Sequence, residues 1–383
     1  MRGIPITSFI TASNYQETME GLALALLVCL ILALVAKKFT LPPIPFYILS
    51  GVALGGSGFA LVQADELSQF LSFLGLIFLL FYVGLEMKPR RFIGQGPSIL
   101  ISGLLDLNIN MAIGFFAALV LGFGTYEAFI IGSAFYISSS AMAVASLIEN
   151  KKLIHPEAET IVWMMIFEDV LLILLLSVIS VEASSPLFLA VKIVAMVSAF
   201  YILIWLGRSL FEGILHRDDE LPVLFTFTAV LAAAFVARFA KIPEALSVIA
   251  LGSALSQTNT AVLERLSQPF RDVFLVLFFV FFGISVQLGG DLHLIPIIVI
   301  TTLAIASKLI SALLMGKSLH GSLASGIEIW ANTIGRGEFS IALAALYGSA
   351  VVTTTIAVMV IVSSIIGSFT ARYSGQIIRA AGP

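Results

Sequence analysis

Residues 163–172 read WMMIFEDVLL and place two adjacent carboxylates, Glu168 and Asp169, inside a long apolar segment. The whole segment covers about residues 159–180, close to the roughly 20 residues that an α-helix needs to cross a bilayer. Asp169 falls at its midpoint, where an ionised side chain costs roughly 2.5–3.5 kcal/mol on insertion scales. Acids at this depth pair with bases or line a wet cavity, and they mark ion or proton pathways.

The rest of the chain is also rich in apolar residues and poor in charged ones. Of its 383 residues, 59% are hydrophobic and 11% are charged, whereas soluble domains carry about 25% charged residues. This excludes a nucleic-acid-binding protein, a secreted disulfide scaffold and an ordinary cytosolic enzyme. The single cysteine, Cys29, allows no disulfide within the chain, and residues 1–20 lack the pattern of a signal peptide. We therefore expect an all-α polytopic membrane protein.

Thirteen apolar segments are long enough to be considered as membrane spans. Their approximate ranges are residues 20–38, 43–62, 67–86, 98–122, 126–147, 159–180, 186–210, 221–240, 243–257, 270–287, 293–316, 322–348 and 352–374. Lys and Arg are enriched in cytoplasmic loops. With the N-terminus outside, 14 of the 20 basic residues fall in cytoplasmic segments and 3 on the opposite side. We predict a multi-pass protein of the cell membrane with an outside N-terminus and a cytoplasmic C-terminus.

Short patterns recur at an offset of about 200 residues. Residues 81–85 (FYVGL) resemble residues 280–284 (VFFGI), and residues 35–37 (VAK) resemble residues 236–238 (VAR). The offset equals seven spans, so the two halves have opposite orientations, as in many secondary transporters with a site near the membrane midplane. We expect one domain over residues 1–383. It comprises a first repeat at about 20–180, a linking helix at 186–210 and a second repeat at about 221–374.

Six ionisable side chains lie deep inside the expected spans. They are Asp106, Glu168, Asp169, Lys308, Arg336 and Glu338. Four acids and two bases leave two negative charges that protons or small cations can balance, so the pattern indicates ion exchange. We predict that Asp169, aided by Glu168, binds the ion and the proton. Lys308 is predicted to be the counter-ion of one of these two acids, and Asp106 is a competing partner or a structural residue.

Two expected spans contain breaks, at residues 137–141 (ISSSA) and 333–340 (TIGRGEFS). Small polar residues and glycines allow a helix to unwind where protein or water satisfies the backbone. The repeat offset aligns the two breaks, which predicts a crossed pair of discontinuous helices. We expect Ser139 and Ser140 to help bind the ion, although such serines also bond to the preceding turn. The residues predicted to support the crossing are Ser138, Arg336, Glu338 and Asp106.

With these residues, the chain resembles monovalent cation:proton antiporters of the Kef-type and NapA-like branch of the sodium/proton exchanger superfamily. The matching features are residues 81–89 (FYVGLEMKP), 281–285 (FFGIS) and 335–339 (GRGEF), the serine-rich break, the acidic pair and Lys308. The resemblance implies a homodimer in which a core of residues 98–180 and 293–374 moves against a dimerisation scaffold in an elevator-like motion. It also implies that Asp169 is the ion-binding and proton-binding aspartate and that Lys308 pairs with the acidic pair.

The chain departs from this family pattern in two respects. Electrogenic relatives commonly carry Asp-Asp at the acidic pair and potassium-selective Kef-type relatives Gln-Asp, so Glu168 leaves ion choice and stoichiometry open. Kef-type proteins often continue into a cytosolic nucleotide-binding domain, whereas this chain stops nine residues after the last expected span. Such regulation is absent, supplied by a separate cytosolic regulatory subunit or lost by truncation.

We therefore expect a secondary active antiporter that exchanges protons for Na⁺ or K⁺. Its expected partners are these ions, the lipid bilayer and a second copy of the chain, with no cofactor, no catalytic residue, no nucleic acid and no metal beyond the transported cation.

The main alternative is a sodium-coupled organic-anion symporter or a channel on a related fold. A single acidic pair facing one lysine, with no further basic pocket, argues against it. A membrane sensor or membrane-embedded enzyme is the second alternative, but the sequence has no metal-ligand spacing or nucleophile elbow.

Overall fold

A computed structural model describes residues 12–39, 41–63, 65–86, 97–179, 186–258, 260–288 and 294–381. These residues form sixteen α-helices, which confirms the all-α prediction. The helices are α1 (Ala12–Lys38), α2 (Pro43–Leu54), α3 (Glu66–Glu86), α4 (Pro97–Val120), α5 (Thr125–Tyr136), α6 (Ser140–Glu149), α7 (Pro156–Ile179), α8 (Pro186–Leu206), α9 (Arg208–Leu215), α10 (Leu221–Ala240), α11 (Glu244–Leu255), α12 (Ala261–Ser285), α13 (Leu294–His320), α14 (Leu323–Thr333), α15 (Glu338–Tyr347) and α16 (Ala350–Ala381). The end of the 81–89 motif lies outside the described residues, as do three basic residues used for orientation, Lys88, Arg90 and Arg91.

The predicted count of thirteen spans is not confirmed. In the described ranges, eight helices are long and apolar enough to cross a membrane, or nine if α8 and α9, which meet at a 77° bend, form one span. Each of the thirteen predicted segments corresponds to one helix or to a pair of consecutive helices. The difference arises because α2 and α11 have 12 residues each and two further segments are interrupted. None of these short helices reaches the length of a full crossing.

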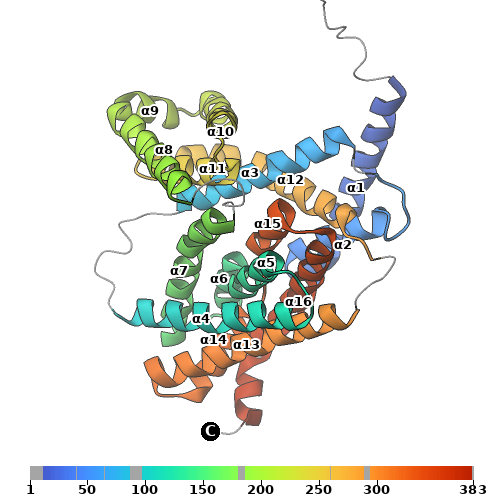
Figure 1. Cartoon of the computed structure of the whole chain (residues 1–383), viewed down its shortest axis with the longest axis vertical. Helices are drawn as coiled ribbons and strands as arrows, with labels where there is room; N and C mark the ends of the chain where they lie inside the picture. The colour runs from blue at the N-terminus through green and yellow to red at the C-terminus, as the bar shows by residue number, and fades with distance from the viewer. Residues whose placement is uncertain are drawn as a thin grey trace, which may run out of the picture.

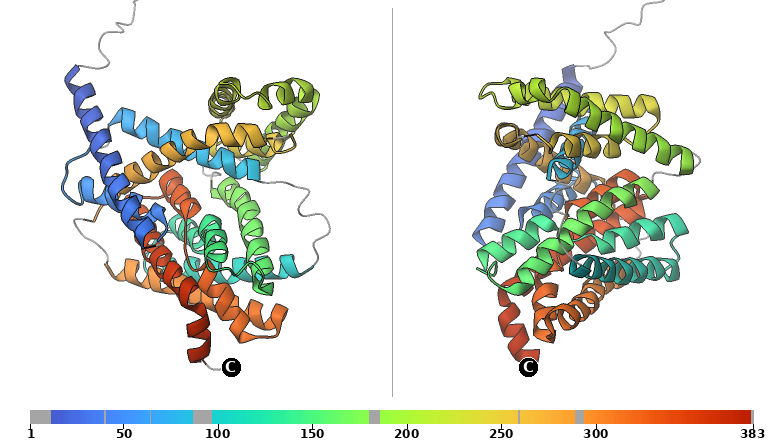
Figure 2. Two further views of the ribbon diagram at one scale, coloured as in Figure 1. Left: turned by 180° about the vertical axis from the view of Figure 1, so that it is seen from behind. Right: turned by 90° about the vertical axis from the view of Figure 1, so that its left-hand side faces the viewer.

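The helices form two groups (Figure 1). The scaffold group consists of α1–α3 and α8–α12, with α3 packed on α11 and α12, and α2 packed on α12. The core group consists of α4–α7 and α13–α16, with α4 packed on α5 and α13, and α14 packed on α13 and α16. Contacts of α7 with α11 and of α2 with α16 join the two groups, and two further views show the same division (Figure 2).

Close glycine contacts hold the scaffold helices together. A Cβ atom on Gly84 of α3 would lie 2.2 Å from the backbone oxygen of Ile249 in α11. A Cβ atom on Gly283 of α12 would lie 2.2 Å from the backbone oxygen of Ile48 in α2. Gly84 and Gly283 occupy matching positions of the two predicted repeats. The same backbone contact is therefore made twice, once at residues 81–85 and once at residues 280–284.

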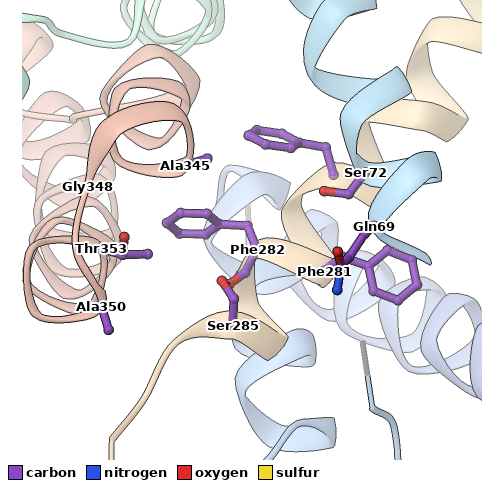
Figure 3. Close-up of a pocket in the computed structure, with 10 residues that line it drawn as sticks. Gln69, Ser72, Phe281, Phe282, Ser285, Ala345, Gly348, Ala350 and Thr353 are labelled. Carbon is purple, nitrogen blue, oxygen red and sulfur yellow. The ribbon is translucent and has the colours of Figure 1, made fainter. Parts of the chain in front are cut away.

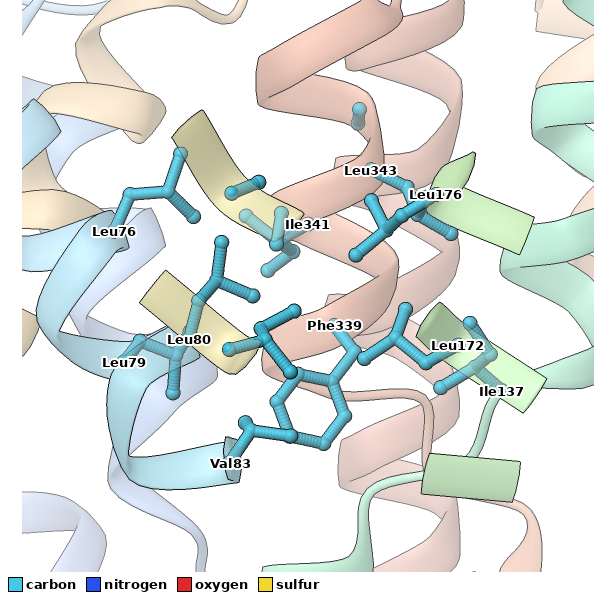
Figure 4. Packing of buried hydrophobic residues seen from close by; sticks show 14 of the residues in the cluster. Leu76, Leu79, Leu80, Val83, Ile137, Leu172, Leu176, Phe339, Ile341 and Leu343 are labelled. Carbon is cyan, nitrogen blue, oxygen red and sulfur yellow. The ribbon is translucent and has the colours of Figure 1, made fainter. Parts of the chain in front are cut away.

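Apolar side chains fill the junction between the two groups (Figure 4). One continuous buried cluster includes residues from α3, α7 and α15 and from the break that follows α5. Its members at the junction are Leu76, Leu79, Leu80, Val83, Ile137, Leu172, Leu176, Phe339, Ile341 and Leu343. Because Ile137 and Phe339 adjoin the two breaks, this apolar layer borders the region where the predicted site residues lie.

A cavity of about 410 Å³ also lies between the groups (Figure 3). The scaffold group lines it from α3 and α12, and the core group lines it from the end of α15 and the start of α16. Its lining residues are Gln69, Ser72, Phe278, Phe281, Phe282, Ser285, Ala345, Gly348, Ala350 and Thr353. These side chains carry no charge, so the cavity differs chemically from the region of the buried acids.

Candidate ion-binding site

The two breaks predicted from the sequence cross each other. Residues 137–139 separate α5 from α6, and residues 334–337 separate α14 from α15. The backbone N–H of Ser139 donates to the carbonyl oxygen of Gly335 at 2.8 Å, which joins the two breaks directly. A Cβ atom at Gly337 would lie 2.5 Å from the Cβ of Ser139, so only glycine permits this approach. The crossed discontinuous helices are thus present.

Hydroxyl groups satisfy backbone groups at both breaks. The N–H of Arg336 donates to Ser363 Oγ at 3.2 Å, and Ser364 Oγ donates to the carbonyl oxygen of Arg336 at 2.7 Å. Ser340 Oγ donates to the carbonyl oxygens of Ala134 at 3.0 Å and of Ile137 at 3.3 Å. Buried backbone groups that leave a helix need such partners, so α15 and α16 stabilise the unwound segments.

Lys308 lies between two buried acids contributed by different helices. Its Nζ is 2.6 Å from Asp106 Oδ2 on α4 and 2.9 Å from Glu168 Oε1 on α7, and all three side chains are at most 1% exposed. Asp106 also accepts hydrogen bonds from Ser311 Oγ at 2.8 Å and from Asn110 Nδ2 at 2.9 Å. Buried charges are tolerated only when they are paired and hydrogen-bonded, and this network meets both conditions.

Glu168 connects this network to the first break. Its Oε2 accepts a hydrogen bond from the backbone N–H of Ser138 at 2.5 Å, and Ser138 Oγ donates to its Oε1 at 3.2 Å. Lys308 Nζ also lies 3.5 Å from the carbonyl oxygen of Tyr136 at the C-terminal end of α5. The position of the unwound segment is thus set by the same side chains that carry the buried charge.

Asp169 has a different environment from that of its neighbour. Successive residues on a helix point about 100° apart, and Asp169 is partly exposed while Glu168 is buried. The ion pairs of Lys308 in the described structure run to Asp106 and Glu168. The predicted pairing of Lys308 with the acidic pair is therefore made through Glu168, and the competing partner Asp106 is bound at the same time.

The remaining predicted residues lie at the helix ends of the crossing. Ser139 caps α6, since its Oγ accepts from the N–H of Met142 at 3.4 Å, and it donates to Glu338 Oε2 at 3.2 Å. Glu338 is the first residue of α15, where a helix N-terminus favours an anion. Ser140 is the first residue of α6 and is partly buried.

Arg336 is fully buried near the C-terminal end of α14. Its guanidinium donates to the carbonyl oxygen of Ala304 at 2.9 Å, to Ser138 Oγ at 3.3 Å and to the carbonyl oxygen of Thr333 at 3.4 Å. Carbonyl groups at a helix C-terminus carry partial negative charge and favour a cation. The charges of Arg336 and Glu338 therefore have the signs that the two half-helix ends of the second break require.

The sequence matches the family described as "Sodium/hydrogen exchanger, transmembrane" over residues 23–373. The chain belongs to the sodium/hydrogen exchanger family. It is a multi-pass integral membrane protein of a transporter family, and the predicted resemblance at the level of the superfamily is confirmed. The Kef-type and NapA-like branch stays a prediction.

Two named relatives of this exchanger-family chain align along nearly their whole length. It is 28% identical over 378 residues to the K(+)/H(+) antiporter subunit KhtU of Bacillus subtilis, covering 93% of each chain. It is 27% identical over 371 residues to the ammonium/H(+) antiporter subunit AmhT of Alkalihalophilus pseudofirmus, covering 92% of each. The solved sodium proton antiporter MjNhaP1 of Methanocaldococcus jannaschii has the same fold, with a TM-score of 0.68, 17% identity and coverage of 95% of this chain and 98% of that one.

Several polar residues of this exchanger-family site were not predicted. They are Asn110, Tyr136, Ser307, Ser311, Ser363 and Ser364. A signal for some of them exists in the sequence, because Asp106 and Asn110 are four residues apart, as are Ser307 and Ser311. That spacing places polar groups on one face of an apolar helix, where they need partners inside the protein.

Proposed function

We propose that the chain is a secondary active antiporter that exchanges protons for a monovalent cation, Na⁺ or K⁺, across the membrane. The observation that carries this proposal is the buried ion-paired network of Asp106, Lys308 and Glu168 beside the crossing, with Asp169 next along α7. Membership of the exchanger family supports it. Two relatives named as K(+)/H(+) and ammonium/H(+) antiporter subunits support a monovalent cation as the second substrate.

The charges at the crossing favour Asp169 as the exchanging group. Lys308 and Arg336 both interact electrostatically with Asp106 and Glu168, so the two bases match these two acids. Glu338 lies at a helix N-terminus and is bonded to Ser139. Asp169 is the partly exposed member of the acidic pair, and in this proposal its carboxylate is neutralised by a proton and by a cation in turn. Competition for one carboxylate couples the two fluxes without covalent chemistry.

Backbone oxygens of the first break are suitable further ligands. The C-terminal end of α5 points its last carbonyl groups at the crossing, and such carbonyls favour cations. Ser139 and Ser140 lie at the N-terminus of α6, which favours anions, but their hydroxyl oxygens can still serve as neutral ligands. We therefore assign the cation to Asp169 with break carbonyls, and keep the two serines as secondary ligands.

The division into two groups of helices supports an elevator-like movement. In this proposal the core group carries the bound ion past the scaffold group, and the apolar layer at the junction separates the site from water. The cavity between the groups gives the core group room to shift. We also propose that two copies of the chain form a homodimer through the scaffold group. The N-terminus then lies outside the cell, and a separate cytosolic subunit regulates the transporter. Relatives named as antiporter subunits are in line with such a partner.

Proteoliposomes with an internal pH dye test the exchange. An acidic lumen is imposed and Na⁺, K⁺ or NH₄⁺ is added outside, for the wild type and for Asp169→Asn. We expect cation addition to dissipate the pH gradient in the wild type and not in the variant, and the most effective cation identifies the substrate. Asp218→Asn is the control, because Asp218 is 75% exposed, lies in the loop between α9 and α10 and pairs with the exposed Arg265 of α12. Wild-type protein that moves no protons with any cation would overturn the proposal and favour the organic-anion symporter.

A further inference from the structure

We infer that the hydroxyl of Tyr136 is a further oxygen ligand of the transported cation, an inference that rests on the exchange proposed above. Tyr136 is the last residue of α5 and its side chain is 0% exposed. In the part of the chain that the structure describes, its hydroxyl has no hydrogen-bond partner. Buried polar side-chain atoms are rarely left without one, so this hydroxyl requires an explanation.

The surroundings of the phenol place it in the site. The carboxylates of Glu168, Asp106 and Asp169 lie within electrostatic range of its hydroxyl. The carbonyl oxygen of the same residue lies 3.5 Å from Lys308 Nζ. The residue directly precedes the break at residues 137–139. The one unpartnered tyrosine hydroxyl among the buried polar atoms of the described chain thus belongs to a residue that contacts Lys308 through its backbone and lies within electrostatic range of the acids that the exchange requires.

Other membrane tyrosines of the same chain do not share this property. The hydroxyl of Tyr126, also on α5, donates to the carbonyl oxygen of Ile179 at 3.4 Å. Tyr201 bonds to Ser253 Oγ at 2.9 Å, and Tyr82 bonds to Ser267. These three hydroxyls have partners, whereas the buried hydroxyl of Tyr136 has none in the described part of the chain.

A phenol suits both states of an exchange site. Its oxygen has lone pairs that can replace water around a dehydrated monovalent cation, and it adds no charge to the acids already present. When a proton replaces the cation, the same hydroxyl rotates and donates to a neighbouring carboxylate. Tyr136 would therefore contribute to cation affinity, while the acidic carboxylate supplies the charge.

The variant Tyr136→Phe tests this role because it removes one oxygen and keeps the ring. We expect the apparent KM for the driving cation to rise about tenfold, because the variant loses one oxygen ligand to a charged group. Vmax should be unchanged. Tyr126→Phe, on the same helix, should leave KM unchanged. Since the hydroxyl has no protein partner, the variant should unfold at the wild-type Tm in the absence of Na⁺ and K⁺.

A second readout follows ion binding without transport. Na⁺ or K⁺ that binds the folded protein at a free concentration c stabilises it by RT ln(1 + c/Kd) and so raises the Tm, and Tyr136→Phe should need about tenfold more cation for the same rise. An unchanged KM and an unchanged Tm response would overturn the inference while leaving the exchange intact. Wild-type protein without any cation-driven proton movement would overturn the proposed function, and this inference with it.

Discussion

The two broken helices cross each other but are held by different chemistry. At the first break, the N–H of Ser138 donates to the carboxylate of Glu168 on α7 at 2.5 Å. At the second break, hydroxyls of Ser363 and Ser364 on α16 hold the peptide groups of Arg336. In the predicted repeats, α7 and α16 occupy matching places. A carboxylate of α7 therefore contacts the first break, in addition to the hydroxyl of Ser340, whereas α16 contacts the second break through neutral hydroxyls.

This difference indicates a division of labour between the repeats. Contacts made by Glu168 depend on its charge and on that of Lys308, so the first break can respond when a proton or cation binds next to it. Contacts made by serine hydroxyls do not depend on ionisation over the physiological pH range. We therefore expect the first repeat to carry the exchange chemistry and the second to hold the crossing in place.

The largest effect on stability is expected at Lys308, a buried base of the second repeat that pairs with two buried acids of the first. Lys308→Leu leaves Asp106 and Glu168 buried without their cation, and breaking a buried ion pair in this way costs about 3–5 kcal/mol. Thermal unfolding of the detergent-solubilised protein measures the loss. Arg265→Leu, which breaks an exposed pair with Asp218, should cost less than about 1 kcal/mol. A Lys308→Leu protein as stable as the wild type would show that the network does not hold the core group together.

A smaller effect is expected where the repeats are alike. Gly84→Ala and Gly283→Ala each place a Cβ 2.2 Å from a backbone oxygen of the facing helix. Overpacking of this kind costs about 1–3 kcal/mol, and because the two contacts match we expect losses of similar size by thermal unfolding. Gly56→Ala, where no atom lies within 4 Å, is the neutral control. A loss confined to one of the two variants would argue against a symmetric scaffold.

The smallest effect separates the two breaks directly. Ser364→Ala removes one hydrogen bond to the Arg336 carbonyl and should cost about 1 kcal/mol of stability, with the apparent KM for the cation unchanged. Ser138→Ala removes a donor to Glu168 and should change the KM. Ser368→Ala is the control, since its hydroxyl bonds only to its own helix at Ser364. A KM change in Ser364→Ala as large as that in Ser138→Ala would remove the proposed distinction.

Much of the site could be predicted because it leaves strong marks in an apolar sequence. Charged residues such as Glu168 and Lys308 are expensive in a membrane, and breaks such as residues 334–337 stand out against continuous apolar helices. The crossing followed from the repeat offset, and the structure contains it. The pairing of Lys308 with both Asp106 and Glu168 could not be chosen in advance, because it depends on how α4, α7 and α13 pack.

Other features depend on tertiary geometry in ways that the sequence does not record. Hydroxyls like those of Ser363 and Ser364 are common in membrane helices and usually bond within their own helix, so their role becomes visible only when α16 lies against the break. Tyr136 is one of eight tyrosines. Its hydroxyl is buried without a hydrogen-bond partner because of the place at which α5 ends, and the sequence does not record that place. The span count differs because α2, α11 and the half-helices are shorter than a bilayer crossing.

The central claim is that exchange takes place at the acidic pair Glu168 and Asp169 of the first repeat, while Glu338 of the second repeat supports the crossing. The most direct measurement compares Asp169→Asn with Glu338→Gln in the same proteoliposome assay, normalised to folded protein. We predict that Asp169→Asn abolishes cation-driven proton movement and that Glu338→Gln retains it with the wild-type KM. Retained exchange in Asp169→Asn, or its loss in a folded Glu338→Gln protein, would contradict the account.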